Sequence, residues 1–226
     1  MSDRRSALLL GATGLIGGHC LRLLLGAPAY DRVHVLVRRA IPVSGDKLTV
    51  SLTDFERLRD HPEAFSVDDI FCCLGTTIKA AGSQEAFRKV DFGYIVEAAR
   101  LGVRCGAQRF LVVSSLGANV HSRVFYSRVK GETEEALRAM GYARLAIFRP
   151  SMLLGGRREV RNGETAAIAA TRILSVFMVG SLRKYRPVEA ELVARAMLVV
   201  AGSSDAGAQV FESDRIRELG THADGR

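Results

Sequence analysis

The sequence predicts an α/β fold: a single domain built on a doubly wound parallel sheet. Short apolar runs alternate with helical segments, the first run leads into a glycine-rich turn, and 226 residues suffice for one substantial core but not for two ordinary domains. Strands that recur with helices between them form parallel βαβ units, and such sheets bind ligands at the carboxyl ends of their strands. We therefore expect functional residues directly after the strands.

The chain begins with a strand, a glycine-rich turn and a helix. Residues 7–10 are apolar, glycines follow at 11, 14 and 17, and residues 20–25 have helical spacing. Gly11 can form the tight bend, Gly14 lets a pyrophosphate approach the backbone, and Gly17 lets the helix lie close to the strand. Free N–H groups at the helix start would face the phosphates. A plain strand-to-helix loop is the alternative, but the early position and the second strand at the expected distance favour nucleotide binding.

The next elements keep the alternation of strands and helices. The expected strands are 33–37, 47–52, 70–74, 109–113 and 145–149, and the expected helices are 85–101 and 127–140. We expect Gly102 and Gly141 to end the two helices, and Pro150 to end the last of these strands.

The residues after Pro150 follow a different pattern. A polar segment at 151–163 precedes an apolar helix at 164–179, a second helix at 189–201 and a last edge strand at Val210 and Phe211. We expect 151–212 to form a substrate-side cap together with this strand. A membrane-surface or dimer-forming role for 166–179 is the alternative. Residues 215–226 are polar, and we expect a frayed tail there.

Composition limits the classes of partner. The formal net charge is +8, but no basic run exceeds two residues and aromatic residues make up only 7%. This favours a solvated arginine-rich surface over a specific nucleic-acid site. No apolar run approaches the roughly 20 residues that span a bilayer, and the N-terminus lacks a signal-peptide pattern. We expect a cytoplasmic protein with no membrane span.

Metal-ligating patterns are missing from the sequence. The cysteines (Cys20, Cys72, Cys73 and Cys105) lack paired metal-ligand spacing, and no two of the five histidines lie four residues apart. We expect no metal site, and we expect the cysteines to be reduced core residues.

Candidate catalytic residues follow the fifth strand. Tyr126 and Lys130 lie four residues apart near a helix start, so their side chains share one face. A free tyrosine has a pKa near 10, and a nearby ammonium favours the phenolate, which suits such a pair to acid–base chemistry. Ser115 could hydrogen-bond a substrate carbonyl oxygen and hold it against Tyr126. A chance pair is the alternative, but the position past Ser115 argues against chance.

The end of the second strand indicates which dinucleotide is preferred. An NAD site carries an acidic residue there for the ribose 2′-hydroxyl, whereas this chain has Arg38 and Arg39 and no adjacent acid. A guanidinium can hold a 2′-phosphate through two charge-assisted hydrogen bonds. We expect NADP(H) to bind more tightly than NAD(H). The alternative is that both arginines are simply solvated.

Several motifs together resemble one protein family. They are Gly-Ala-Thr-Gly-Leu-Ile-Gly at 11–17, Asp-Phe-Glu at 54–56, Cys-Cys-Leu-Gly-Thr-Thr at 72–77, Val-Asp at 90–91, Ser-Ser at 114–115, Tyr-Ser-Arg-Val-Lys-Gly-Glu at 126–132 and Phe-Arg-Pro at 148–150. The set is similar to atypical or extended short-chain dehydrogenases/reductases, and within them to the Tat-interacting-protein-like branch. The similarity covers about residues 8–201, and the Cys-Cys-Leu-Gly-Thr-Thr segment is more specific than the glycine turn.

The resemblance implies a Rossmann domain that binds NADPH. It implies that the pyrophosphate is lined by residues of the glycine turn, namely Gly11, Thr13, Gly14, Leu15, Ile16 and Gly17. The ribose phosphate would contact Arg38, and the adenine would contact Asp54 and Phe55. The cofactor ribose would contact Leu74, Gly75 and Thr76, and the nicotinamide would lie among Tyr126, Lys130 and Pro150.

Two classes of function stay open at this point. In the first, the chain is an NADP(H)-dependent oxidoreductase of a small carbonyl or alcohol compound, with Ser115, Tyr126 and Lys130 as the catalytic set. In the second, it is an NADPH-sensing regulator whose Rossmann domain binds a protein partner with little or no turnover. A protein partner or a homodimer is compatible with either class. The sequence favours the enzyme, because a binding module has no evident need for these three side chains together.

Overall fold

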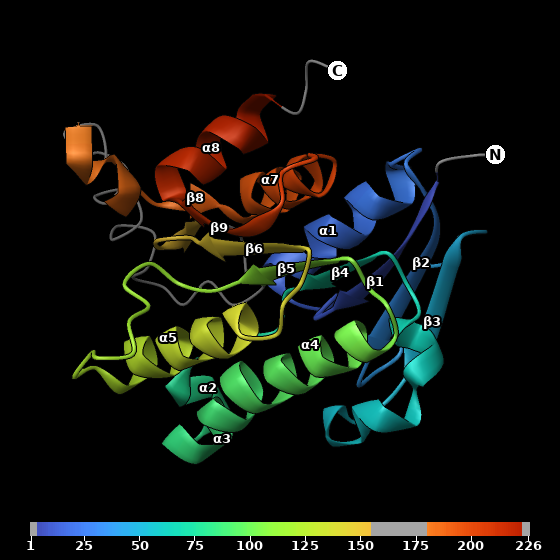
Figure 1. The fold of residues 1–226 in the computed structure, drawn as a ribbon, viewed down its shortest axis with the longest axis horizontal. Helices are drawn as coiled ribbons and strands as arrows, with labels where there is room; N and C mark the ends of the chain where they lie inside the picture. Colours follow the sequence, from blue (N-terminus) through green and yellow to red (C-terminus); the bar gives the residue numbers. More distant parts are fainter. Residues whose placement is uncertain (1–3, 155–179, 223–226) are drawn as a thin grey trace.

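A seven-stranded parallel sheet forms the centre of the computed structural model, which describes residues 4–154 and 180–222 (Figure 1). Its strands run in the order β3-β2-β1-β4-β5-β6-β9. They are β1 (Arg5–Leu10), β2 (Tyr30–Val37), β3 (Leu48–Leu52), β4 (Asp69–Cys72), β5 (Arg109–Val113), β6 (Arg144–Arg149) and β9 (Gly207–Glu212). All neighbouring strands pair in parallel. This confirms the predicted doubly wound α/β fold.

Helices cover both faces of the sheet (Figure 1). One layer holds α1 (Leu15–Gly26), α7 (Ala190–Ala201) and α8 (Ser213–His222), and the other holds α2 (Ile78–Ala81), α3 (Gln84–Arg88), α4 (Ile95–Arg104) and α5 (Phe125–Arg138). Ala7 and Leu9 pack toward the first layer and Leu8 and Leu10 toward the second, because successive side chains of a strand point to opposite faces. All four are fully buried, which explains the uninterrupted apolar run at 7–10.

The predicted helix at 85–101 is longer and less regular than its sequence pattern indicates. It consists of α3, a π-helical turn (Lys89–Tyr94) and α4, which continues past Gly102 to Arg104. The expectation that Gly102 ends the helix is therefore wrong. A β-carbon at Gly102 would overlap the side chains of Tyr142 and Ile70, so this glycine is required by packing. The chain turns at Gly106 instead, with a φ of +87°.

The described C-terminal part of the chain contains two α-helices, of which the sequence predicted one. The expected helix at 189–201 is α7, which packs beside α1. The expected frayed tail is wrong as far as His222, because α8 buries Ile216 and places Gly220 against the backbone of Leu192. A short strand β7 (Leu153–Leu154) pairs with β8 (Val188–Glu189). The helix expected at 164–179, with its alternative roles, lies outside the described residues.

Short helical turns complete the described fold. They are η1 (Phe55–Asp60), η2 (Pro62–Phe65) and η4 (Gly180–Tyr185). No helix in the described part of the chain is long and apolar enough to cross a membrane.

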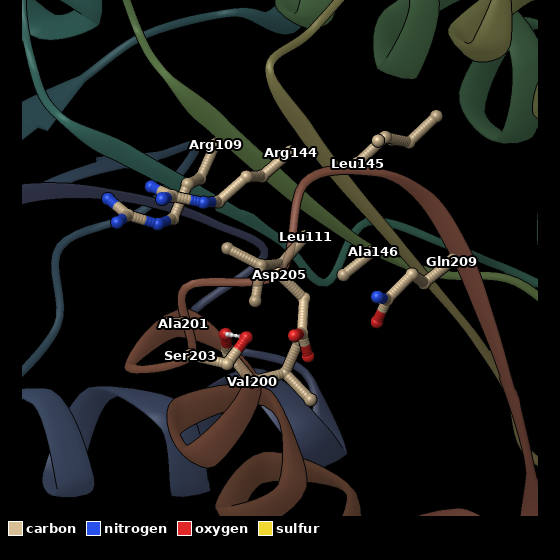
Figure 2. A pocket seen from close by; sticks show the side chains of 11 residues that line it. Arg109, Leu111, Arg144, Leu145, Ala146, Val200, Ala201, Ser203, Asp205 and Gln209 are labelled. Atoms are coloured by element: carbon tan, nitrogen blue, oxygen red, sulfur yellow. Dashed lines mark hydrogen bonds between the residues drawn. The ribbon is translucent and has the colours of Figure 1, made fainter.

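The amino ends of the strands carry a buried charge cluster. Asp69 accepts hydrogen bonds from Arg5 at 2.6 Å, from Arg109 at 3.0 Å and from the Tyr30 hydroxyl at 2.6 Å. Beside it, Arg109 and its register partner Arg144 line a cavity of about 20 Å³ (Figure 2). Such a volume holds about one water molecule. This cavity is therefore too small for an organic ligand, and doubly wound sheets bind their ligands at the carboxyl ends of the strands.

Candidate active site

The glycine turn has the geometry of a phosphate cradle. Gly11 has a φ of +84°, and a β-carbon there would lie 2.6 Å from the carbonyl oxygen of Cys73. A β-carbon at Gly17 would overlap the carbonyl of Gly11, so this glycine allows α1 to approach β1. Gly14 caps α1 without a side-chain partner, and no acidic residue lies in the first helical turn. The N–H groups at this helix start can therefore face an anion.

The remaining residues of the turn differ in what they can offer a ligand. Thr13 is exposed, and Leu15 is half-buried, whereas Ile16 is buried in the core between α1 and the sheet. Ile16 can therefore meet a pyrophosphate only through its backbone.

The turn lies where the strand order reverses. From β1 the chain first builds β2 and β3 on one side and then β4, β5 and β6 on the other. Doubly wound sheets bind ligands in the crevice at such a point. Leu74 is buried here and Thr76 is half-buried, while Gly75 is exposed. The structure thus brings the predicted pyrophosphate and ribose segments together.

The predicted adenine and ribose-phosphate residues lie at the ends of β2 and β3. Arg38 and Arg39 are exposed directly after β2. Asp54 caps η1 by accepting a hydrogen bond from the N–H of Glu56 at 3.1 Å. Phe55 is buried with its ring 5.9 Å from that of Tyr94, so its side chain belongs to the core. Any contact of Phe55 with an adenine has to come from its backbone.

Lys130 is held by a buried carboxylate. Its Nζ atom lies 2.7 Å from Oδ1 of Asp91, and both side chains are almost completely buried. The other oxygen of Asp91 accepts the N–H of Thr76 at 2.9 Å, and its backbone carbonyl accepts the Thr133 hydroxyl at 2.8 Å. Asp91 lies in the π-helical turn, a local irregularity that is frequent at functional sites.

This ion pair keeps the lysine charged next to the ribose segment. Burial by itself lowers the pKa of Lys130, but the Asp91 charge and the neighbouring Tyr126 raise it, and the resulting pKa lies above the ordinary lysine value. A β-carbon at Gly75 would lie 3.8 Å from the Lys130 ammonium nitrogen. The ammonium is therefore directly beside the exposed end of β4.

Tyr126 and Ser115 are carried on elements that contact each other. Tyr126 lies one turn before Lys130 on α5, with its ring 5.2 Å from that of Phe87. Ser115 lies in the loop after β5, which continues to Asn119. A β-carbon at Gly131 would overlap the backbone of Asn119, so this glycine lets the loop lie against α5. Asn119 also donates its N–H to the carbonyl of Ser127 at 3.0 Å.

A buried carboxylate connects this helix to two strand ends. Glu134 accepts a hydrogen bond from the Ser114 hydroxyl at 2.6 Å and two from Arg149, at 2.9 and 2.5 Å. Arg138 adds a contact of 3.1 Å. These hydrogen bonds raise the pKa of Arg149. Since Ser114 precedes Ser115 and Arg149 precedes the buried Pro150, Glu134 fixes α5 relative to both predicted site residues.

An open cavity of about 560 Å³ lies beside Ser115. It is lined by residues after β5, at and after the end of β6, at the end of β9 and within η4, among them Ser115, Arg149, Ser151, Met152, Tyr185 and Glu212. A small organic molecule fits this volume. The structure thus places Ser115 beside a substrate-sized cavity at the carboxyl ends of the strands, where the glycine turn also lies.

Asp91 and Glu134 are functional candidates for which the sequence predicted no role. Glu134 follows Lys130 by four residues and so shares its helix face, a spacing that was available in the sequence. Asp91 is an acid within an otherwise apolar helix face, a weaker signal because exposed acids on helices are common. Its pairing with Lys130 depends on how two helices pack.

The described residues contain no group of three or more side chains that could hold a metal ion. The four cysteines are free thiols, and Cys20 and Cys72 are buried.

Comparisons with known proteins point in one direction. The model of the NAD dependent epimerase/dehydratase family matches residues 7–212. Protein HTATIP2 of Rattus norvegicus is 34% identical over 228 residues, which cover 99% of this chain and 92% of that protein. Protein fmp52, mitochondrial, of Aspergillus clavatus is 34% identical over 216 residues, covering 91% and 88%. Among solved structures, MoeE5 in complex with UDP-glucuronic acid and NAD has a TM-score of 0.68 at 19% identity, covering 91% of this chain and 75% of that one, which is a likeness of fold.

Proposed function

Because the chain belongs to the NAD dependent epimerase/dehydratase family, we propose that it is an NADP(H)-dependent oxidoreductase acting on a small carbonyl or alcohol compound. Membership of the family confirms the resemblance that the sequence motifs carry. One observation supports an enzyme. Lys130 lies beside Gly75 and one helical turn from Tyr126, at the carboxyl ends of the strands where the glycine turn also lies.

Three side chains would carry the reaction. The Ser115 hydroxyl donates a hydrogen bond to the substrate carbonyl oxygen, and the Tyr126 hydroxyl gives that oxygen its proton during reduction. The bound cofactor would supply a hydride to the carbonyl carbon in reduction, or accept one from the alcohol carbon in oxidation. The Lys130 ammonium has donors beyond the one directed at Asp91, and these are available for ribose hydroxyls and for the phenolate left on Tyr126.

The residues present fit a dinucleotide. The glycine turn offers free N–H groups without a nearby acid, and the exposed Arg38 and Arg39 follow β2, where a ribose 2′-phosphate would lie. We propose that these arginines favour NADP(H) over NAD(H) and that the cavity beside Ser115 takes the substrate. Residence in the cytoplasm stays a prediction.

One assay tests the proposal. The purified chain is mixed with NADPH and a panel of aldehydes, ketones and quinones, and the loss of NADPH absorbance is followed. We expect turnover with at least one carbonyl class. NADPH binding by calorimetry without turnover on the whole panel would instead support a regulator that responds to the cofactor. No NADPH binding at all would contradict both.

A further inference from the structure

Three sulfur atoms form a chain of contacts beside the glycine turn. The thiol of Cys73, directly after β4, contacts the Sγ atom of Cys20 on α1 at 3.8 Å. The thiol of Cys20 in turn contacts the Sδ atom of Met197 on α7 at 3.9 Å. Cys20 and Met197 are fully buried, whereas Cys73 is partly exposed. Solvent can therefore reach one thiol, and that thiol touches a second one inside the protein.

The direction of the side chains explains why Cys73, and not the adjacent Cys72, meets Cys20. Successive residues of a strand point to opposite faces of the sheet. Cys72 packs into the core on the side of α4, whereas Cys73 packs against the core on the side of α1, where Cys20 lies. The thiol of Cys105, at the end of α4, contacts the carbonyl of Pro62 at 3.5 Å. Among the four cysteines, which all lie in the described part of the chain, the structure thus pairs Cys20 with Cys73.

The two thiols also connect the two backbone segments that form the phosphate cradle. The N–H of Cys73 donates to the carbonyl of Leu10 at 2.9 Å, and the carbonyl of Cys73 lies against Gly11. Cys20 lies on α1, whose first N–H groups face the cradle. Because the sheet holds the backbone of Cys73, a closer approach of the two sulfur atoms would draw α1 toward β4 and displace those N–H groups.

We propose that Cys20 and Cys73 are a modification site, at which a peroxide oxidises the two thiols to a disulfide and thereby weakens dinucleotide binding at the glycine turn. A disulfide bond is about 2.05 Å long, so the sulfur atoms, now 3.8 Å apart, have to approach by roughly 1.8 Å. The effect on the dinucleotide rests on the proposed function, whereas the formation of the disulfide does not.

The oxidation proceeds in two balanced steps. The thiolate of Cys73 attacks one oxygen of hydrogen peroxide, the O–O bond breaks, and a sulfenic acid forms; the hydroxide that leaves takes up the proton that the thiol has lost. The sulfur of Cys20 then attacks the sulfenic sulfur, the S–O bond breaks, and a second water leaves with the proton of the Cys20 thiol. The two thiols lose two electrons, and one peroxide becomes two waters. An external thiol reverses the reaction by exchange.

The surroundings of Cys73 decide which oxidant can act on it. The contact with Cys20 and burial raise the pKa of the Cys73 thiol well above its ordinary value, and Cys20 is also the titratable group whose charge acts on it. The thiolate is the nucleophile, so it is scarce at neutral pH, and the pair stays reduced until peroxide exposure is sustained. A small, uncharged oxidant also suits a thiol that is only partly exposed.

Thiol counting by mass spectrometry tests the site in the full chain. The reduced protein, with its four free thiols, is treated with hydrogen peroxide, and catalase then removes the excess. The remaining thiols are alkylated after denaturation, and the digested protein is mapped for linked peptides. Calorimetry measures NADPH affinity before oxidation, after it, and again after reduction with dithiothreitol. Cys73→Ser and Cys20→Ala each remove one member of the pair, and Cys105→Ser, at a partly exposed cysteine away from it, is the matched control.

We expect the native chain and Cys105→Ser each to lose two thiols to one bond between Cys20 and Cys73. Their NADPH affinity should fall roughly tenfold and return with dithiothreitol. Cys73→Ser and Cys20→Ala should form no disulfide, and Cys73→Ser should keep its NADPH affinity after peroxide treatment. Because Cys73 is partly exposed, its substitution keeps the test decisive even where the buried Cys20→Ala change harms folding.

Three results would overturn the proposal: a bond between Cys72 and Cys73, oxidation without any bond, or an oxidised native chain with unchanged NADPH affinity. A reduced chain that binds no NADPH would contradict the proposed function, and the effect on affinity with it. The peptide map decides on the disulfide in either case.

Discussion

The ammonium nitrogen of Lys130 lies 2.7 Å from the carboxylate of Asp91, inside the protein and next to the exposed Gly75. The pair joins α5 to the π-helical turn before α4. Because Asp91 also accepts the N–H of Thr76, the same carboxylate orients the lysine and the segment after β4. One buried acid thus links a candidate catalytic residue to a candidate cofactor-binding segment.

Replacing Tyr126 by Phe should abolish reduction and leave NADPH affinity nearly intact. In the proposed reaction the phenol donates a proton to the substrate, and general acid catalysis typically raises a rate by about 10²–10⁴. The ring contact with Phe87 is kept, so folding is preserved. Steady-state kinetics and calorimetry with NADPH measure the two effects. Lys130→Ala should harm both. A Phe variant that keeps most of its kcat would remove Tyr126 from the acid role.

Replacing Asp91 by Asn should destabilise the fold by about 3–5 kcal/mol, because a buried ammonium loses its partner. Urea unfolding measures the loss, with Asp31→Asn, at an exposed position of β2, as the control. Converting Lys130 to Met in the Asp91 variant should restore part of the stability. If Asp91→Asn unfolds at the same urea midpoint as the native protein, then Asp91 does not compensate the buried charge of Lys130, and the prediction is wrong.

Alkaline pH should weaken the native fold through Lys130. Its pKa is raised in the folded protein, so the ion pair contributes fully below the unfolded lysine value near 10.4 and is lost as pH rises through the higher folded value. The unfolding free energy of the native chain should therefore fall above about pH 10.4 more steeply than that of Lys130→Met. Parallel unfolding curves for the two proteins across that range would contradict this assignment.

Replacing Gly14 by Val should weaken dinucleotide binding by well over tenfold, about 1.4 kcal/mol or more. The added side chain would project where the pyrophosphate approaches the start of α1. Gly18→Ala is the control, because a β-carbon there meets only the carbonyl of Ala12, at an ordinary 3.7 Å. NADPH fluorescence titration reports the affinity, and thermal unfolding checks the fold. Equal titration curves for Gly14→Val and the native chain would place the nucleotide elsewhere.

NADPH should bind more tightly than NADH by about ten- to a hundredfold at low salt, because charge-assisted hydrogen bonds contribute roughly 1.5–3 kcal/mol. Arg38 is exposed at the end of β2, free to meet a 2′-phosphate. Arg38→Asp should narrow or reverse the preference. Calorimetry with both cofactors on both proteins, and on Arg104→Ala as control, measures it. Equal affinities in the native chain would remove Arg38 from the cofactor site.

The central strands β1, β4, β5 and β6 were predictable because they are buried on both faces. Each is a short apolar run that a glycine, a proline or a polar turn ends, and β5 has the predicted bounds. The glycine turn was equally readable, since the roles assigned to Gly11 and Gly17 follow from local geometry. The C-terminal helix α8 was missed because it buries little more than Ile216 on an otherwise polar surface.

The candidate site was predictable only in part. Tyr126 and Lys130 share a helix face because they lie four residues apart, and this spacing can be read from the sequence alone. The ion pair with Asp91 and the contacts of Glu134 with Ser114 and Arg149 join residues from different elements, so no local pattern reveals them. The π-helical turn that places Asp91 also breaks the regular period on which helix prediction depends.

The contacts of Glu134 also order the assembly of the chain. A carboxylate that is 1% exposed is costly to bury unless Ser114 and Arg149 are already in place, and these follow β5 and β6. We therefore expect helix α5 to dock after, or together with, the pairing of these two strands. During refolding, amide exchange should show protection in β5 and β6 no later than in α5. A partly folded chain in which α5 has not docked would also lack the ion pair between Lys130 and Asp91, because Lys130 lies on the same helix.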